Sequence, residues 1–240
     1  MRAVSVPSPY RIPEQAALGT IRYRIAMRDG IPWHWAETGE QHVVQDGDTV
    51  VVTVCRTCGR EAAPTADELQ RALQRNPWAD NGDAVVRMFA SDLRGATVDR
   101  RMRNLVDAVR QQMSGHVDFS RYLTSREAYE AQRGDCSEAA VLLAAAAKAR
   151  HIPVRVVFGM AYASRFLGMK RVFWPHMWVQ AWTGERWTSY DAGLGEFDST
   201  HIALAVGDGS PDTLVPAVLK LPDVRIVSAE GVLPALAASH

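Results

Sequence analysis

The sequence predicts an α+β fold in which a helical layer packs on an antiparallel β-sheet. Two observations support this fold class. A run of small apolar residues from Ala139 to Ala147 has no polar face, which is typical of a buried, central helix. Two aromatic-rich alternating runs, 176–182 and 187–191, flank a connection that contains Gly184, and this pattern predicts a β-hairpin.

The first sixty residues are expected to form an extended arm, 1–19, followed by a small N-terminal β unit, 20–60. Three prolines interrupt the arm. In the β unit, apolar residues alternate with arginines at 21–25 as in a half-buried strand, and Asp46-Gly47 lies between two apolar runs as in a hairpin. The sequence leaves open whether this unit is a separate domain or an extension of the main sheet.

Residues 61–233 are expected to form one larger domain, with a frayed tail at 234–240. The first half of this domain is predicted to be helical. Thr65 and Thr124 each precede a glutamate by three residues, and this capping box is typical of a helix start. Between these two helices, apolar residues spaced three and four apart predict two more, with Gly115 placed at the end of the second.

The second half of the larger domain is expected to contribute strands. Pro153 ends the buried helix, and the β-branched run at 154–158 predicts a strand directly after it. Residues 201–206 predict a further strand and residues 207–211 a loop, and residues 224–227 are expected to add an edge strand.

Charge and composition exclude several classes of function. Lysine and arginine together number 27, as do aspartate and glutamate, so no net charge draws the chain to nucleic acid or to an anionic membrane. No run of 18 apolar residues occurs, so no transmembrane segment is expected. The N-terminus is too polar for a signal peptide, which predicts a cytoplasmic protein, or a periplasmic or secreted one if a signal has been removed.

Three cysteines cannot all pair with one another, so at least one thiol is free. Cys55 and Cys58 form a CxxC motif with three interpretations: a local disulfide, half of a zinc site, or two unremarkable thiols. A complete zinc site needs two more ligands, and only His34 and His42 lie nearby. Cys136 is then the odd cysteine, as a catalytic thiol requires.

Cys136 is expected to lie in the first turn of the buried helix, because Gly134 allows a sharp turn just before it. A helix N-terminus carries partial positive charge and unpaired N–H groups, which stabilise a thiolate and can hold a developing oxyanion. We therefore expect the pKa of this thiol to be lowered.

A thiol nucleophile needs a base, and the base needs an orienting group. If the hairpin loop has two or four residues, cross-strand partners have residue numbers with an odd sum, as 176 and 191 have. His176 and Asp191 then lie on the same face, close enough to form a hydrogen bond, whereas a three-residue loop without a bulge would separate them. His201, His151 and His116 are weaker candidates for the base, and His201 is the natural control.

Cys136 in a Gly-Asp-Cys sequence, a His-x-Trp strand 40 residues on and an aspartate 15 residues beyond it resemble the transglutaminase-like superfamily of cysteine amidases, peptidases and acyltransferases. The resemblance covers about 124 to about 208. It implies a papain-like core with Cys136 as nucleophile, His176 as general base and acid, and Asp191 as the residue that orients His176. Ala192 departs from the pattern, since many members have proline there.

The resemblance implies amide chemistry through a thioester acyl-enzyme, and bacterial-looking members favour hydrolysis of a peptide, isopeptide or other amide bond. Transfer of the acyl group to an amine, as in transglutaminases, is the alternative. A non-catalytic module that binds a peptide or a cell-wall partner is the alternative from another class. No cofactor and no metal in the cleft are expected, because a Cys-His-Asp site needs none. The expected partner is a peptide or protein amide substrate, and no oligomeric state is predicted.

Substrate contacts are expected from the segment 159–175, which is interpreted as irregular and lies next to the thiol by its position in the chain. Its residues Tyr162, Arg165 and Trp174, together with Trp178, are the candidates for substrate binding. An ordinary surface hairpin is the alternative interpretation of this segment.

Overall fold

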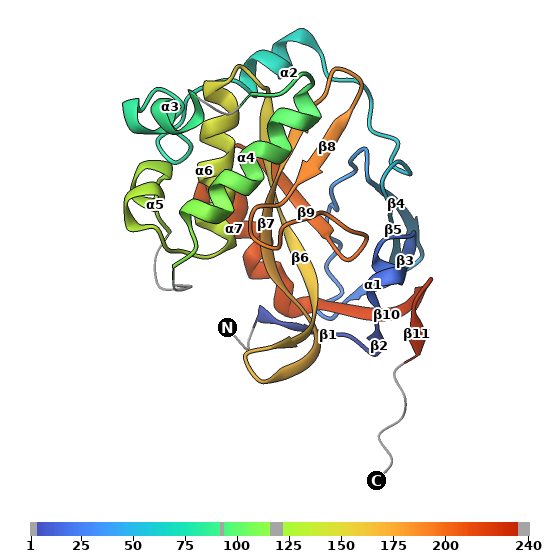
Figure 1. The fold of residues 1–240 in the computed structure, drawn as a ribbon. Coiled ribbons are helices and arrows are strands. Elements are labelled where there is room, and N and C mark those ends of the chain that lie inside the picture. The colour runs from blue at the N-terminus through green and yellow to red at the C-terminus, as the bar shows by residue number, and fades with distance from the viewer. Residues whose placement is uncertain (1–3, 92–93, 116–121, 235–240) are drawn as a thin grey trace.

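The computed structural model of the chain describes residues 4–91, 94–115 and 122–234. Figure 1 shows a layer of helices on one side of the long strands β6 and β7 and a second, smaller sheet on the other side. The predicted α+β fold, with helices packed on antiparallel strands, is confirmed. None of the helices in these ranges is long and apolar enough to span a membrane. His116 lies outside the described residues, and so do residues 235–240 of the predicted frayed tail.

The main sheet is antiparallel and is built around one long hairpin. Its strands are β1 (Val6–Pro7), β6 (Val154–Phe166), β7 (Met169–Trp182), β8 (Trp187–Tyr190) and β9 (Ile202–Gly207). Strand β9 pairs with β6, and both β1 and β8 pair with β7. The hairpin of β6 and β7 therefore forms the centre of the sheet.

The segment 159–175 is not irregular, because it forms the outer half of the hairpin of β6 and β7. The alternative interpretation, a hairpin between two strands, is the correct one. Leu167 and Gly168 make the turn, and both have positive φ, as hairpin turns require. The aromatic and basic side chains of this segment therefore alternate between two faces of a ribbon instead of forming one wall.

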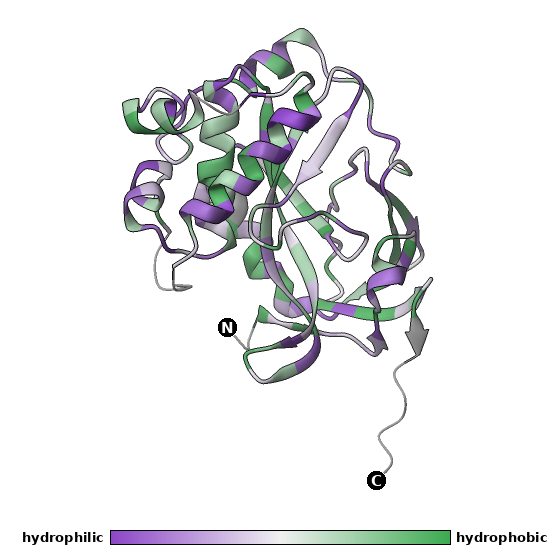
Figure 2. Ribbon diagram, in the orientation of Figure 1, coloured by the Kyte–Doolittle hydropathy of each residue, from purple (hydrophilic) through white to green (hydrophobic). Residues whose placement is uncertain are grey.

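The helical layer surrounds α6, whose small side chains let its neighbours approach closely. The helices are α1 (Glu14–Ala17), α2 (Ala66–Arg71), α3 (Ala84–Ser91), α4 (Val98–Gln112), α5 (Ser125–Ala131), α6 (Cys136–Ala149) and α7 (Pro211–Lys220). Helix α6 contacts α3, α4, α5 and strands β6 and β7, and residues 139–147 are all buried. Figure 2 shows this helix and the strands under it in hydrophobic colours. The expected buried central helix is confirmed.

Local sequence signals account for several helix starts. The predicted capping boxes are present at the starts of α2 and α5, where Thr65 and Thr124 each exchange hydrogen bonds with the glutamate three residues on. Helix α7 begins at Pro211, the last residue of the predicted loop, and continues through residues for which the sequence predicted no element. Its N-terminus carries a Ser210 cap followed by Pro211, which are recognisable start signals, but Pro216 inside the helix argues against helical structure.

The second sheet combines strands from both ends of the described chain. Its order is β10 (Val224–Glu230), β3 (Ile21–Met27), β5 (Thr49–Val54) and β4 (Gln41–Asp46). Strands β2 (Tyr10–Arg11) and β11 (Leu233–Pro234) form a separate two-stranded pair. Because β10 pairs along β3, a strand close to the C-terminal end of the described residues completes the sheet of the N-terminal β unit.

Buried polar contacts join the second sheet to the main sheet. The hydroxyl of Tyr23 donates to the carbonyl of Ser199 at 2.9 Å, and its ring meets that of Phe173 edge to face. The side chain of Gln41 bonds both the backbone N–H and the carbonyl of Ala203 at 2.8 Å. These contacts hold the start of β9 in place, immediately after His201.

Candidate active site

Cys136 is the first residue of α6, as predicted. Asp135 is the N-cap, and its carboxylate accepts a hydrogen bond from the backbone N–H of Ser137 at 2.7 Å. Glu138 completes a capping box by accepting from the N–H of Asp135 at 2.8 Å. A Cβ at Gly134 would lie 2.7 Å from the Cβ of Glu138, so only glycine fits the turn into this helix.

Burial governs the state of the Cys136 thiol. The residue is 9% exposed, and burial raises the pKa of the thiol well above its usual value. The neighbouring carboxylate of Asp135 acts in the same direction, whereas a hydrogen bond from the backbone of Met177 lowers the pKa. The expectation of a lowered pKa, based on the helix N-terminus alone, is therefore wrong for this structure because desolvation outweighs the helix end.

The hairpin of β7 and β8 brings His176 and Asp191 together. Val179 pairs with Tyr190 and Trp182 with Trp187, so the connecting loop has four residues and partner numbers have an odd sum. His176 and Asp191 consequently lie on one face, diagonally across the strands, and Nε2 of His176 is 2.7 Å from Oδ2 of Asp191. The predicted same-face placement is confirmed.

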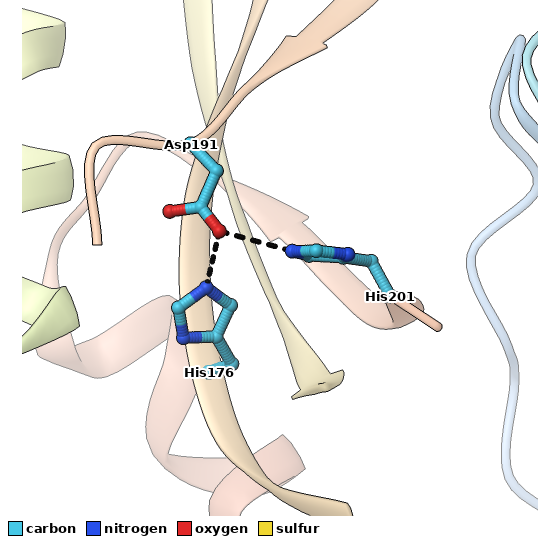
Figure 3. Close-up of side chains that lie close together, drawn as sticks. All are labelled: His176, Asp191 and His201. Carbon is cyan, nitrogen blue, oxygen red and sulfur yellow. Dashed lines mark hydrogen bonds and ion pairs between the residues drawn. The ribbon is translucent and has the colours of Figure 1, made fainter. Parts of the chain in front are cut away.

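His176 turns its second ring nitrogen away from Asp191, as Figure 3 shows. This Nδ1 atom is buried and has no hydrogen-bond partner among the described residues. A Cβ placed on Gly193 would lie 3.1 Å from the Cβ of Cys136 and 3.1 Å from Cε1 of His176, so both residues flank the same point. Cys136 and His176 also line one cavity of about 340 Å³.

Asp191 is fully buried and its carboxylate is held from two sides. Oδ1 accepts from the backbone N–H groups of Gly193 at 2.7 Å and Leu194 at 3.1 Å. Oδ2 faces the imidazoles of His176 at 2.7 Å and His201 at 2.9 Å. Burial alone would raise the pKa of this carboxyl group, but the two imidazoles hold it well below its usual range. Asp191 is therefore ionised.

His201 contacts the same carboxylate, so it cannot serve as the histidine that lies outside the site in a control experiment. Figure 3 shows His176 and His201 converging on one oxygen of Asp191. These three side chains also form the one group of at least three potential metal ligands within the described ranges, with ligand atoms within 4.8 Å of one another. Asp191 lies at hydrogen-bond distance from each of the two imidazoles. These contacts fit hydrogen bonds between the side chains better than coordination of a common ion. His151, an exposed residue behind α6, is the appropriate control.

Of the four residues predicted to bind substrate, the structure places Trp174 in the cavity with Cys136. Trp178 is buried beneath His176 and donates its indole N–H to Ser189 at 3.1 Å. Tyr162 packs on Phe173 and accepts a hydrogen bond from the N–H of Ile12. Arg165 lies near the exposed end of the hairpin, paired in register with Lys170.

Other cavity walls come from residues that sequence reasoning did not select. Phe166 stacks on Trp174 at a ring-centroid distance of 3.8 Å, and Leu194 follows the Asp191 turn. Helix α4 contributes Arg110 and Met113. Helical periodicity places Arg110 off the buried apolar stripe of α4, as in a solvated face, and only the packing of α4 against α6 reveals that this residue reaches the cavity.

Cys55 and Cys58 form a disulfide, the first of the three interpretations of the CxxC motif. Cys136 is the free cysteine. The disulfide closes the turn after β5 and lies on the second sheet, so it takes no part in the cavity around Cys136. A zinc site built from these two cysteines would require the disulfide to open.

The fold and the middle part of the chain are similar to those of transglutaminase-like proteins. Residues 87–192 match the family model of the transglutaminase-like superfamily, which confirms the resemblance found in the sequence. This segment contains Cys136, His176 and Asp191. None of the curated proteins compared with the chain matches it.

Two solved structures show the same fold. A candidate cysteine protease from Cytophaga hutchinsonii superposes with a TM-score of 0.53 and 13% identity, covering 94% of this chain and 84% of its own. The periplasmic domain of TgpA from Pseudomonas aeruginosa superposes with a TM-score of 0.54 and 19% identity, covering 78% of this chain and 76% of its own. At these identities the likeness establishes the fold alone.

Proposed function

We propose that the chain is a thiol-dependent hydrolase of peptide or other amide bonds, with Cys136 as nucleophile, His176 as general base and acid, and Asp191 as the residue that orients His176. The observation that carries this proposal is the free Nδ1 of His176. One nitrogen of this buried imidazole is fixed by Asp191, while the other has no partner among the described residues and borders the cavity that Cys136 lines. A buried nitrogen without a partner costs free energy, so its position beside a thiol points to a proton acceptor.

The reaction starts from a neutral thiol. Because burial raises the pKa of Cys136, the thiol keeps its proton until a substrate carbonyl enters the cavity. As Sγ attacks the carbonyl carbon, the thiol proton passes to Nδ1 of His176. Asp191 stabilises the imidazolium that forms at His176 and keeps Nε2 protonated throughout.

The tetrahedral intermediate carries a negative oxygen that needs hydrogen-bond donors. The backbone N–H of Cys136 belongs to the first turn of α6, where N–H groups have no partner within the helix. It is the proposed donor, and one such donor typically contributes about 10²–10³ in kcat. The imidazolium of His176 then gives its proton to the leaving amine, which leaves a thioester on Cys136.

Water completes the cycle. His176, neutral again, removes a proton from water as the water oxygen attacks the thioester, and the acid and the thiol are released. If an amine enters in place of water, the same acyl-enzyme gives a new amide, which is transglutaminase-type transfer. Mass spectrometry of products formed with and without a primary amine separates these outcomes, since hydrolysis adds 18 Da to the cleaved substrate and transfer does not.

The experiment that tests the proposal needs no known substrate. Cys136 alkylation by iodoacetamide is followed across pH 5–10 by peptide-resolved mass spectrometry in the wild type, His176→Ala and His151→Asn. We expect the wild type and His151→Asn to show a plateau of reactivity near neutral pH that His176→Ala lacks. If the three proteins react alike, His176 does not activate Cys136 and the enzyme proposal fails in favour of a non-catalytic binding module.

A further inference from the structure

His201 lies in a position where both of its ring nitrogens meet carboxylates. It precedes β9 and is 1% exposed. Nε2 is 2.9 Å from Oδ2 of Asp191, and Nδ1 is 3.1 Å from Oδ1 of Asp198 and 3.2 Å from its carbonyl oxygen. The backbone N–H of Asp198 also points at Nδ1, at 3.3 Å, a contact in which Nδ1 would accept. The carboxylate contacts are shorter, at 2.9 and 3.1 Å, so we assign both ring nitrogens as donors, which only the imidazolium form can be.

The surroundings of His201 favour a fixed positive charge. Asp191 and Asp198 are the carboxylates that face it directly, and Trp178 and Phe197 cover its ring without adding charge. Burial alone would lower the pKa of His201, but the bonds to the two carboxylates raise it to about 9.

Two more titratable groups act from neighbouring elements. The imidazole of His176 on β7 lies 5.4 Å away between ring centroids. The buried carboxyl group of Glu40, from the second sheet, interacts with His201 at longer range. The carboxylate oxygen that orients His176 is therefore shared with a second imidazole that is already charged.

We propose that His201 is a positioning residue of this site: clamped as a cation between Asp191 and Asp198, it fixes the orientation of Asp191 and, through the shared oxygen, that of His176. The inference rests on the proposed function, since it concerns the same Asp191 that orients His176. Because His176 and His201 contact the same oxygen of Asp191, the position of one ring depends on the other.

The charge of His201 has a measurable consequence for pH dependence. A cation at His201 repels the positive charge that forms on the ring of His176 when His176 takes the thiol proton. Replacing His201 by glutamine removes the charge but retains an N–H donor for Asp191. The acid limb of Cys136 reactivity should then move to higher pH. For two charges separated by the ring-centroid distance of 5.4 Å, the shift is about one to two pH units.

The test compares the pH profiles of Cys136 alkylation in the wild type, His201→Gln and the control His151→Asn. Asparagine tolerates the positive φ of 57° at position 151. We expect the acid limb to shift upward only in His201→Gln, with thermal unfolding recorded for all three proteins. An unshifted acid limb in folded His201→Gln overturns the inference while leaving the proposed function intact. Failure of the proposed function looks different, because Cys136 would then react in the same way with and without His176.

A second measurement uses the unmodified protein, so it does not depend on how His201→Gln folds. Long-range ¹H–¹⁵N spectra report the protonation of each imidazole ring between pH 5 and pH 10. We expect the ring of His201 to keep both of its protons up to about pH 9. Its signals are assigned by their couplings, or by their absence from the spectrum of His201→Asn. A neutral His201 ring at pH 7 would contradict the inference directly.

Discussion

At the scale of single residues, Asp191 connects every part of the candidate site. Its carboxylate accepts hydrogen bonds from two imidazoles and from two backbone amides of the following turn. Ala192 takes no part in these hydrogen bonds. The carboxylate itself holds the turn, through the N–H groups of Gly193 and Leu194.

Replacing Asp191 by asparagine should remove the charge and invert the hydrogen-bond pattern. The amide group cannot accept at both of its atoms, so His176 would lose its fixed tautomer. We expect kcat on any amide substrate to fall by about 10²–10⁴ with little change in KM. The exposed turn residue Asp48 supplies the matched control, Asp48→Asn, which should retain full activity. An Asp191→Asn enzyme with normal kcat would show that Asp191 is only structural.

Gly193 lies beside both Cys136 and His176, the proposed nucleophile and base. An alanine there would place its Cβ 3.1 Å from both Cys136 and His176, which is tighter than normal van der Waals contact. We predict that Gly193→Ala slows Cys136 alkylation at least tenfold and leaves the fold intact. Gly184 in the β7–β8 loop is a poor control: a Cβ there would meet no atom, but its φ of +100° strains any other residue. Ala192→Ser is the better control, because it changes the turn that contains Gly193 without adding a side chain at Gly193. Unchanged alkylation in Gly193→Ala would mean that the two side chains are not held against each other.

At the scale of elements, helix α6 carries a buried lysine directly after its run of apolar residues. Lys148 is 3% exposed in the last turn, and burial lowers the pKa of its amino group, partly offset by Asp208. The folded pKa lies below the unfolded value, so the unfolded chain binds more protons in the window between them. The free energy of unfolding should therefore rise with pH as pH approaches the ordinary lysine pKa of about 10.4.

Lys148→Met should remove this penalty while preserving the volume of the side chain. We expect the free energy of unfolding at pH 7 to increase by about 1–2 kcal/mol, and the rise with pH to be smaller than in the wild type. Urea unfolding at pH 7, 8.5 and 10 measures both effects. The exposed Lys170→Met should change neither. A destabilised Lys148→Met protein would indicate that the ammonium group has a partner that the structure does not reveal.

Elements differed in how far the sequence could predict them. The capping boxes of α2 and α5 and the odd-sum register of the β7–β8 hairpin depend on residues a few positions apart, so local rules were enough. The outer half of the β6–β7 hairpin has no such local signal, because its strand structure comes from pairing across the ribbon. Helix α7 has clear start signals, but Pro216 obscured them.

At the scale of the whole molecule, the candidate site depends on packing between distant elements. His176 and Asp191 come from one hairpin, whereas Cys136 arrives on α6 and Arg110 on α4. The pairing of His176 with Asp191 could therefore be predicted from strand parity. The approach of α4 to the cavity and the second imidazole on Asp191 could not, because no local pattern relates positions 110 or 201 to position 136.

The contact of Tyr23 with Ser199 links the two sheets and supports the segment that leads to His201. Tyr23→Phe removes the buried hydroxyl group and leaves the Ser199 carbonyl without this donor. We expect a loss of about 1–2 kcal/mol in the free energy of unfolding, with no change in the pH profile of Cys136 alkylation. Chemical denaturation and alkylation of the same sample test both parts. Tyr10→Phe, in the two-stranded pair, is the matched control and should cost less.

The pairing of β10 with β3 also constrains how the protein can be made. Strands β3, β4 and β5 are synthesised early, but one edge of β3 stays open until residues 224–230 have left the ribosome. Open strand edges pair readily with other chains. During synthesis, most of the polypeptide must therefore emerge while this edge is unprotected. Chains that stop short of β10 should accumulate as aggregates, and a chaperone that covers sheet edges should raise the yield of full-length protein.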